Sequence, residues 1–260
     1  MSTRLAMLTA MVALTSMISL ASTARAEWQT FVIRQGGDVS PAILDNSDYG
    51  VAAKEFVISA ASMKAGWGTN AMNGQAIGDL AAISINRLDD TSRFAVGSGP
   101  AVAPYFNIWI TDGLGKYAVV ANEPSNAEWT GTTEWNMTWD ILKTKSLKVY
   151  ENNDKSWLPN NGVGLTFADL KDFTIQAPSA AELTIGWAGL GTGAPRELGT
   201  NVAYGFNWVF GDTLSNYVSG AEGYVVANPT VVPEPGMLAL LGMGAAGIGV
   251  ITIRRRKARA

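Results

Sequence analysis

Apolar and polar residues alternate with a period of two through most of the chain between residues 31 and 227. Successive side chains of a β-strand point to opposite faces, so this alternation is typical of strands with one buried face. Glycine- and asparagine-rich turn signals separate the alternating segments. The segments expected to form strands are 31–34, 54–59, 81–87, 105–111, 117–122, 135–141, 145–150, 172–176, 183–187, 202–210 and 217–227. Many short strands joined by such turns predict an all-β fold, a β-sandwich or jelly roll.

The clearest expected hairpin joins 106–111 to 116–120 through the loop Asp112-Gly113-Leu114-Gly115. Short helical turns are expected within 52–65 and 167–171. No linker rich in Pro, Gly or Ser interrupts the middle of the chain. We therefore expect a single domain over residues 27–228.

The 260-residue chain contains no His and no Cys. It therefore cannot form a Ser-His-Asp triad, a Cys-His nucleophile, an imidazole or thiolate zinc site, or a disulfide. Acid–base chemistry would depend on carboxylates, Lys or Tyr, and a metal would need oxygen ligands. We expect no cofactor, no catalytic residue and no enzymatic activity.

The formal net charge of −3 is unevenly distributed. Residues 1–26 carry a net charge of +2 and residues 232–260 carry +4, which leaves −9 for residues 27–231. An acidic body repels phosphate groups, so nucleic acid is not an expected partner.

The N-terminus has the three parts of a secretory signal peptide. Arg4 gives a basic start, residues 5–20 are mostly apolar, and Ala24-Arg25-Ala26 fits an A-x-A cleavage site. Residues 1–26 are therefore predicted to be a signal peptide that signal peptidase removes after Ala26.

The C-terminal residues 229–260 also have three parts. Val232-Pro233-Glu234-Pro235 precedes 17 uncharged residues, 237–253, and the tail 254–260 begins Arg254-Arg255-Arg256-Lys257. At about 1.5 Å per helical residue the apolar run spans roughly 25 Å, close to the thickness of a bilayer core. The basic residues would stay in the cytoplasm by the positive-inside rule, so the body would lie outside the inner membrane.

This tail resembles the PEP-CTERM sorting signal of Gram-negative bacteria, a signal also labelled an ice-binding protein C-terminal domain. The resemblance covers about 29 of the 260 residues and leaves the body unassigned. It implies recognition by an exosortase, a membrane protease-transpeptidase that removes the transmembrane helix near the motif. The precursor would cross the inner membrane transiently, and the mature protein would reach the cell surface or the extracellular matrix.

Loop tryptophans are the candidate binding residues of the body. Trp67 lies between two glycines, and Trp157 follows Asn153 and Asp154 in a polar stretch. An exposed Trp can stack on a sugar ring while Asn and Asp bind its hydroxyl groups, although Trp in a β-sandwich is more often part of the core. Trp109, Trp135, Trp139, Trp187 and Trp208 fall in expected strands and are assigned to the core.

Carboxylates next to tryptophans suggest an alternative, a glycoside hydrolase of lectin-like fold. Glu123, Glu128, Glu134 and Asp140 lie near Trp129, Trp135 and Trp139, but they do not alternate along one strand. Solvated surface acids are the simpler interpretation.

Three oxygen-rich loops could each hold a structural calcium ion. They are Asp45-Asn46-Ser47-Asp48, Asp89-Asp90 and Glu151-Asn152-Asn153-Asp154. None has the spacing of a dedicated calcium loop, and such residues are common in turns because they bond their own backbone.

The sequence supports three hypotheses about function. The first is an exported, non-enzymatic surface or matrix protein that binds polysaccharide. The second is a secreted carboxylate-dependent glycoside hydrolase, and the third is a purely structural matrix component. Two carboxylates facing each other across a Trp-lined groove would favour the hydrolase.

Overall fold

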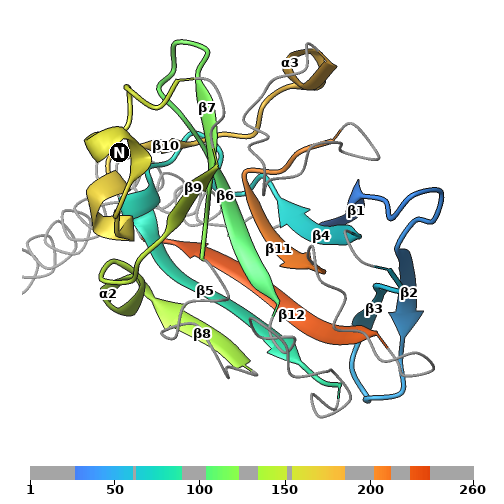
Figure 1. Cartoon of the computed structure of the whole chain (residues 1–260). Helices are drawn as coiled ribbons and strands as arrows, with labels where there is room; N and C mark the ends of the chain where they lie inside the picture. The colour runs from blue at the N-terminus through green and yellow to red at the C-terminus, as the bar shows by residue number, and fades with distance from the viewer. Residues whose placement is uncertain are drawn as a thin grey trace, which may run out of the picture. The chain divides into compact units, whose positions relative to one another are not determined.

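The computed structural model describes residues 27–60, 63–89, 104–122, 134–150, 154–184, 202–211 and 223–234 of the chain. In these residues the chain forms two antiparallel β-sheets with a few short helices (Figure 1). The first sheet has the spatial order β1 (Gln29–Arg34), β4 (Lys64–Thr69), β11 (Phe206–Phe210), β6 (Tyr105–Thr111), β7 (Tyr117–Ala121) and β9 (Lys148–Tyr150), and β10 (Thr174–Ile175) pairs with β6. The second has the order β2 (Ala42–Asn46), β3 (Ala53–Val57), β12 (Tyr224–Pro233), β5 (Leu80–Arg87) and β8 (Glu134–Thr138).

Short helices connect some of these strands. Three are 3₁₀ turns and two are α-helical. They are η1 (Ile77–Asp79), α2 (Trp139–Leu142), η4 (Pro159–Gly162), η5 (Phe167–Leu170) and α3 (Ala180–Thr184). The all-β prediction is confirmed.

The strands pair in a nested order. β6 pairs with β7, β5 with β8, β4 with β11, and β3 with β12. These four pairs form one long antiparallel double strand that is closed at one end by the β6–β7 hairpin. The chain changes sheet at each step from β3 to β6, so successive pairs of this double strand lie in alternate sheets. This is the strand order of a jelly roll.

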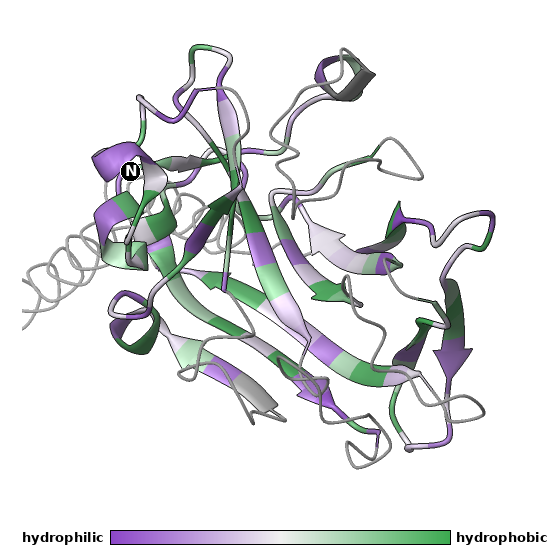
Figure 2. Cartoon of the chain, viewed as in Figure 1, coloured by the Kyte–Doolittle hydropathy of each residue, from purple (hydrophilic) through white to green (hydrophobic). Residues whose placement is uncertain are grey.

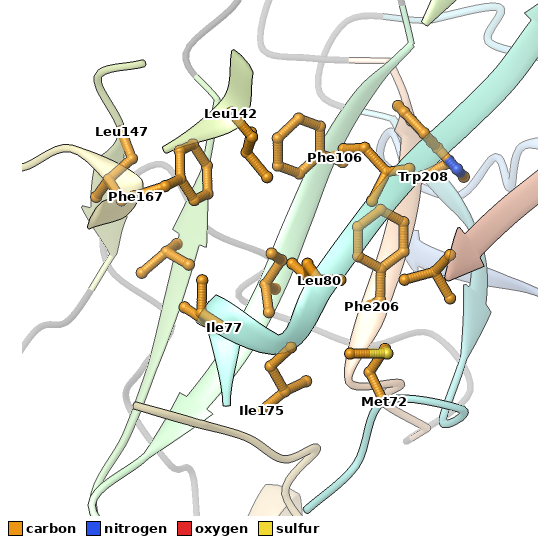
Figure 3. Close-up of a cluster of buried hydrophobic side chains, with 14 of the residues drawn as sticks. Met72, Ile77, Leu80, Phe106, Leu142, Leu147, Phe167, Ile175, Phe206 and Trp208 are labelled. Carbon is orange, nitrogen blue, oxygen red and sulfur yellow. The ribbon is translucent and has the colours of Figure 1, made fainter. Parts of the chain in front are cut away.

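The main core lies between the two sheets and is rich in aromatic rings (Figure 3). Phe106, Phe206 and Trp208 of the first sheet are fully buried. Phe56 of β3 stacks on Phe210 of β11 with ring centroids 4.0 Å apart, which joins the two sheets. The hydropathy colouring shows apolar and polar residues interspersed along β6 and β12, whereas most of β5 is apolar (Figure 2).

The first sheet is buried on its other face as well. Trp109, Tyr117 and Val119 form a second cluster there, and Phe31 and Val209 belong to a third. This double burial explains why every residue of β7 and β11 is buried although only one face meets the main core.

Several local predictions differ from the structure. The helical turn expected within 52–65 is wrong, because β3 and β4 occupy half of that range and its other described residues are not helical. The strand β2 was not expected. Residues 183–184, expected to begin a strand, belong to α3, and 185–187 lie outside the described residues. The 3₁₀ helix η5 confirms the turn expected at 167–171.

Close packing explains the glycines of β4. A Cβ atom on Gly66 would lie 2.6 Å from the ring of Phe31, and one on Gly68 would lie 2.4 Å from Asn207 Oδ1. Glycine is rare in strands, and for this reason the sequence around Trp67 resembled a loop. In the structure both glycines are needed because a larger residue would collide with neighbouring side chains.

The body extends past its expected end at residue 228. β12 continues to Pro233, and residues Ala26–Pro233 form one compact unit. The first two residues of the Val-Pro-Glu-Pro motif therefore belong to the last strand of the jelly roll.

Candidate functional site

The C-terminal strand β12 consists of two halves that are held differently. Residues Tyr224–Ala227 pair with β3 on one side, and β5 runs along the other side of the strand. The register then shifts between Ala227 and Thr230, where Asn228 has a φ of 51° and Pro229 follows it. From Thr230 to Pro233 the described pairing is with β5 alone. Proline lacks a backbone N–H, and it fits a position where the described pairing needs no donor on the side away from β5.

Burial also differs along the second half. Val231 is 6% exposed and belongs to the main core, whereas Val232 is 45% exposed. The Ser84 and Thr230 hydroxyl oxygens lie 2.6 Å apart, which adds a side-chain hydrogen bond between β5 and β12. Glu234 is exposed just after the strand ends. The described part of the motif therefore begins on the sheet and ends in solvent.

Trp67 was expected in a loop but lies in a strand with its ring buried, so it is not available to bind a sugar. It lies within β4 and is only 8% exposed. Its ring makes edge contacts with Trp28 at 6.4 Å and tilted contacts with Phe56 at 6.2 Å between centroids. A ring packed in this way cannot also stack on a sugar.

Trp157 lies in the loop before η4, as expected, and is half-buried. It packs against the main core and contacts Phe173 with ring centroids 5.7 Å apart. Its indole Nε1 is buried and has no hydrogen-bond partner. Trp157 is therefore partly a core residue, with the rest of its side chain in contact with solvent.

Asp154 lies close to Trp157 in sequence and is held by three hydrogen bonds. Lys116 Nζ donates to its carboxylate at 2.7 Å, and the Ser156 hydroxyl and backbone N–H donate at 2.6 and 2.8 Å. The Lys116 bond and then the Ser156 bonds hold the pKa of Asp154 well below its ordinary value. The same ion pair raises the pKa of Lys116. Asn153 lies outside the described residues.

Lys116, Asp154, Ser156 and Trp157, with the exposed Asn160 and Asn161, are called here the Trp157 surface. Asn160 and Asn161 have φ values of 45° and 51°, in the left-handed region that Asn tolerates best after Gly. Sequence reasoning identified Trp157 and Asp154 but missed Lys116, because it is 38 residues from Asp154 in the chain.

Of the acids considered for hydrolysis, Asp140 alone has its side chain among the described residues. Asp140 lies at the start of α2, where Lys143 donates to its carboxylate at 2.6 Å and lowers its pKa. Glu134 begins β8. Glu123 and Glu128 fall outside the described residues.

Two of the calcium candidates use their carboxylates in other ways. Asp45 accepts a hydrogen bond from Lys54, and Asn46 accepts one from the Asp48 backbone. Asp89 forms a buried ion pair with Arg87 at 2.6 Å. Among the described residues no group of three or more acidic side chains is arranged to hold a metal ion.

The remaining predicted features lie outside the described residues. They are the signal peptide with Ala24 and Ala26, Pro235, the apolar run 237–253 and the basic tail with Arg254, Arg255, Arg256 and Lys257. In the part of the chain that the structure describes, no helix is both long and apolar enough to cross a membrane.

Comparison with known proteins assigns the tail. Residues 231–257 match the family model of the PEP-CTERM protein-sorting motif. No curated protein and no solved structure matches the chain. The match confirms the predicted motif and indicates an exported protein that an exosortase processes.

Proposed function

We propose that this chain is the precursor of a non-enzymatic jelly-roll protein of the cell surface or extracellular matrix. The observation that carries the proposal is the sorting motif at residues 231–257, which begins within the last three residues of a compact β-rich body. Signal peptidase would remove residues 1–26, and an exosortase would remove the C-terminal helix near Val232-Pro233-Glu234-Pro235. The body would then be released or joined to surface polysaccharide.

The mass of the mature protein tests this processing. Intact-mass analysis of surface and secreted fractions should find a chain that begins at Glu27 and has lost the apolar run 237–253. A matched strain without exosortase should retain residues 237–260. Full retention of those residues in cells that contain exosortase would contradict the proposal.

We further infer that the body binds polysaccharide through the Trp157 surface. Trp157 is half-buried, and Asp154 and Asn160 belong to the same segment after β9. Lys116 lies in the loop between β6 and β7 and is joined to Asp154 by their ion pair. Aromatic rings with nearby polar side chains are common in ligand sites, and lectin domains share the jelly-roll architecture. The fold likeness is an analogy, so the inference depends on the surface itself.

Trp157→Leu tests this binding because Leu keeps apolar packing but lacks the aromatic face. Retention of the body on immobilised extracellular polysaccharide should fall at least tenfold. Ile141→Ala is the matched control, since Ile141 is also an exposed apolar residue, 47% exposed on α2. Equal retention of Trp157→Leu and the unsubstituted body would contradict the inference.

A turnover assay separates binding from hydrolysis. The body should release no reducing sugar from the polysaccharide that it retains. Release that depends on Asp140 or Glu134 would favour the carboxylate hydrolase instead.

A further inference from the structure

The sorting motif begins inside the folded body. In β12, Val232 lies opposite Ala82 of β5, and Pro233 lies opposite Leu80. Only residues 234–236 separate the strand from the apolar run that begins at Met237. Three fully extended residues span roughly 10 Å. If the apolar run lies in the membrane, a protease would therefore find only a very short stretch of unfolded chain between the membrane and the end of β12.

We propose that residues Thr230–Pro233 must separate from β5 before exosortase cuts the chain, so that the stability of this pairing sets the rate of processing. Proteases act on locally opened segments, and their rate follows the population of the open form when opening is fast. The proposal depends on the exosortase processing proposed above.

The structure defines where the opening would stop. The register shift at Asn228 and Pro229 divides β12, and beyond it the described pairing is with β5 alone. Val231 in the core and the hydroxyl pair of Ser84 and Thr230 hold this segment. The half of β12 before the shift pairs on both sides, so it can stay in place when the end separates.

Asp89 strengthens the half that stays. Its carboxylate accepts a hydrogen bond from the Val225 backbone at 3.0 Å and is itself buried against Arg87. The Leu88 backbone also donates to the Val225 carbonyl at 2.7 Å. Opening from the C-terminal end therefore stops at the register shift without unfolding the body.

A disulfide between β5 and β12 tests the proposal. Ser84 and Thr230 lie opposite each other with their hydroxyl oxygens 2.6 Å apart, which suits the geometry of a disulfide. The chain has no Cys, and both positions lie outside the Val-Pro-Glu-Pro motif. We expect the oxidised full-length Ser84→Cys/Thr230→Cys precursor to be cleaved at least tenfold more slowly than the reduced form, in membranes that contain exosortase.

The matched control ties the same residue of β5 to its other neighbour. Asn136 of β8 lies opposite Ser84, so Ser84→Cys/Asn136→Cys forms a similar bridge that leaves β12 free. Its oxidised and reduced forms should be cleaved at equal rates.

A second variant weakens the pairing. Val231→Ala removes the buried anchor of the segment and should raise the cleavage rate severalfold. Val149→Ala is the control, because Val149 is similarly buried at 7% exposure but lies in β9 of the other sheet. It should leave the cleavage rate near that of the unsubstituted precursor.

The outcomes are distinguishable. Equal cleavage of oxidised and reduced Ser84→Cys/Thr230→Cys would overturn the opening step, and so would an unchanged rate in Val231→Ala. Failure of the unsubstituted precursor to be cleaved at all would overturn the exosortase processing itself.

Discussion

Two tryptophans with similar sequence contexts have different surroundings in the fold. Both Trp67 and Trp157 are next to small or polar residues, which favoured loops for both. Burial of Trp67 depends on Trp28 and Phe56, and neither contact is visible in the local sequence. Local composition placed Trp157 correctly in a loop but not Trp67, which lies in β4 and whose ring is covered by residues distant in the chain.

Substitution of each tryptophan should separate these roles. Trp67→Ala should lower the free energy of unfolding by about 3–5 kcal/mol, as expected for a buried aromatic ring. Trp157→Ala should lower it by about 1–2 kcal/mol, because only part of its side chain packs on the core. Urea unfolding followed by tryptophan fluorescence measures both, and equal losses would contradict the assignment of Trp157 to the surface.

The pKa of Asp154 should depend on Lys116. The lowered pKa means that the ion pair stabilises the fold above the ordinary value of 3.8 and that this contribution is lost as the pH falls through the folded pKa. Lys116→Met should raise the pKa of Asp154 toward 3.8, while the Ser156 bonds keep it lower than that. NMR titration of the side-chain carboxyl measures the change. Lys143→Met, which breaks the separate pair with Asp140, should leave it unaltered.

Turn chemistry was the most reliable guide to how neighbouring strands connect. Asp112 Oδ1 accepts hydrogen bonds from the backbone of Leu114 and Lys116, and Gly113 and Gly115 have positive φ values of 74° and 98°. Asp and Gly are the residues that such turns need, so the β6–β7 hairpin was predictable. β4 was not, since its glycines are explained only by residues of other strands.

The buried ion pair of Arg87 and Asp89 lies at the end of β5, where Asp89 also forms a hydrogen bond with β12. Both side chains are fully buried, and Asp89 also accepts the Val225 N–H. Asp89→Ala would leave the Arg87 charge buried without this partner and should cost about 3–5 kcal/mol of stability. Asp45→Ala breaks the exposed pair with Lys54 and should cost less than about 1 kcal/mol. Chemical denaturation of the two variants compares them, and a small loss for Asp89→Ala would contradict the role of the pair.

The strand order of the jelly roll depends on pairings between residues that are distant in the sequence. Gly223 donates its backbone N–H to Glu55 across 168 positions, next to the pairing of β3 with β12. Alternation predicts that strands exist, but it does not say which distant strands meet. The sorting motif was predictable for the opposite reason, because its parts are contiguous and are identified by their order.

The second half of β12 should contribute measurably to the stability of the body. A chain ending at Asn228 lacks the half of β12 that carries Val231, whereas one ending at Glu234 keeps it. Loss of one buried Val at about 1.5–3 kcal/mol and of a few strand hydrogen bonds at about 1 kcal/mol each should make the shorter chain about 3–5 kcal/mol less stable. A third chain ending at Gly236 is the control and should match the one ending at Glu234. All three begin at Glu27, and thermal unfolding followed by circular dichroism should give one cooperative transition for each of the two longer chains. Equal stability of all three would mean that residues 229–233 add nothing to the fold, and a cleavage site anywhere in the motif would then be open to the protease without any separation of strands.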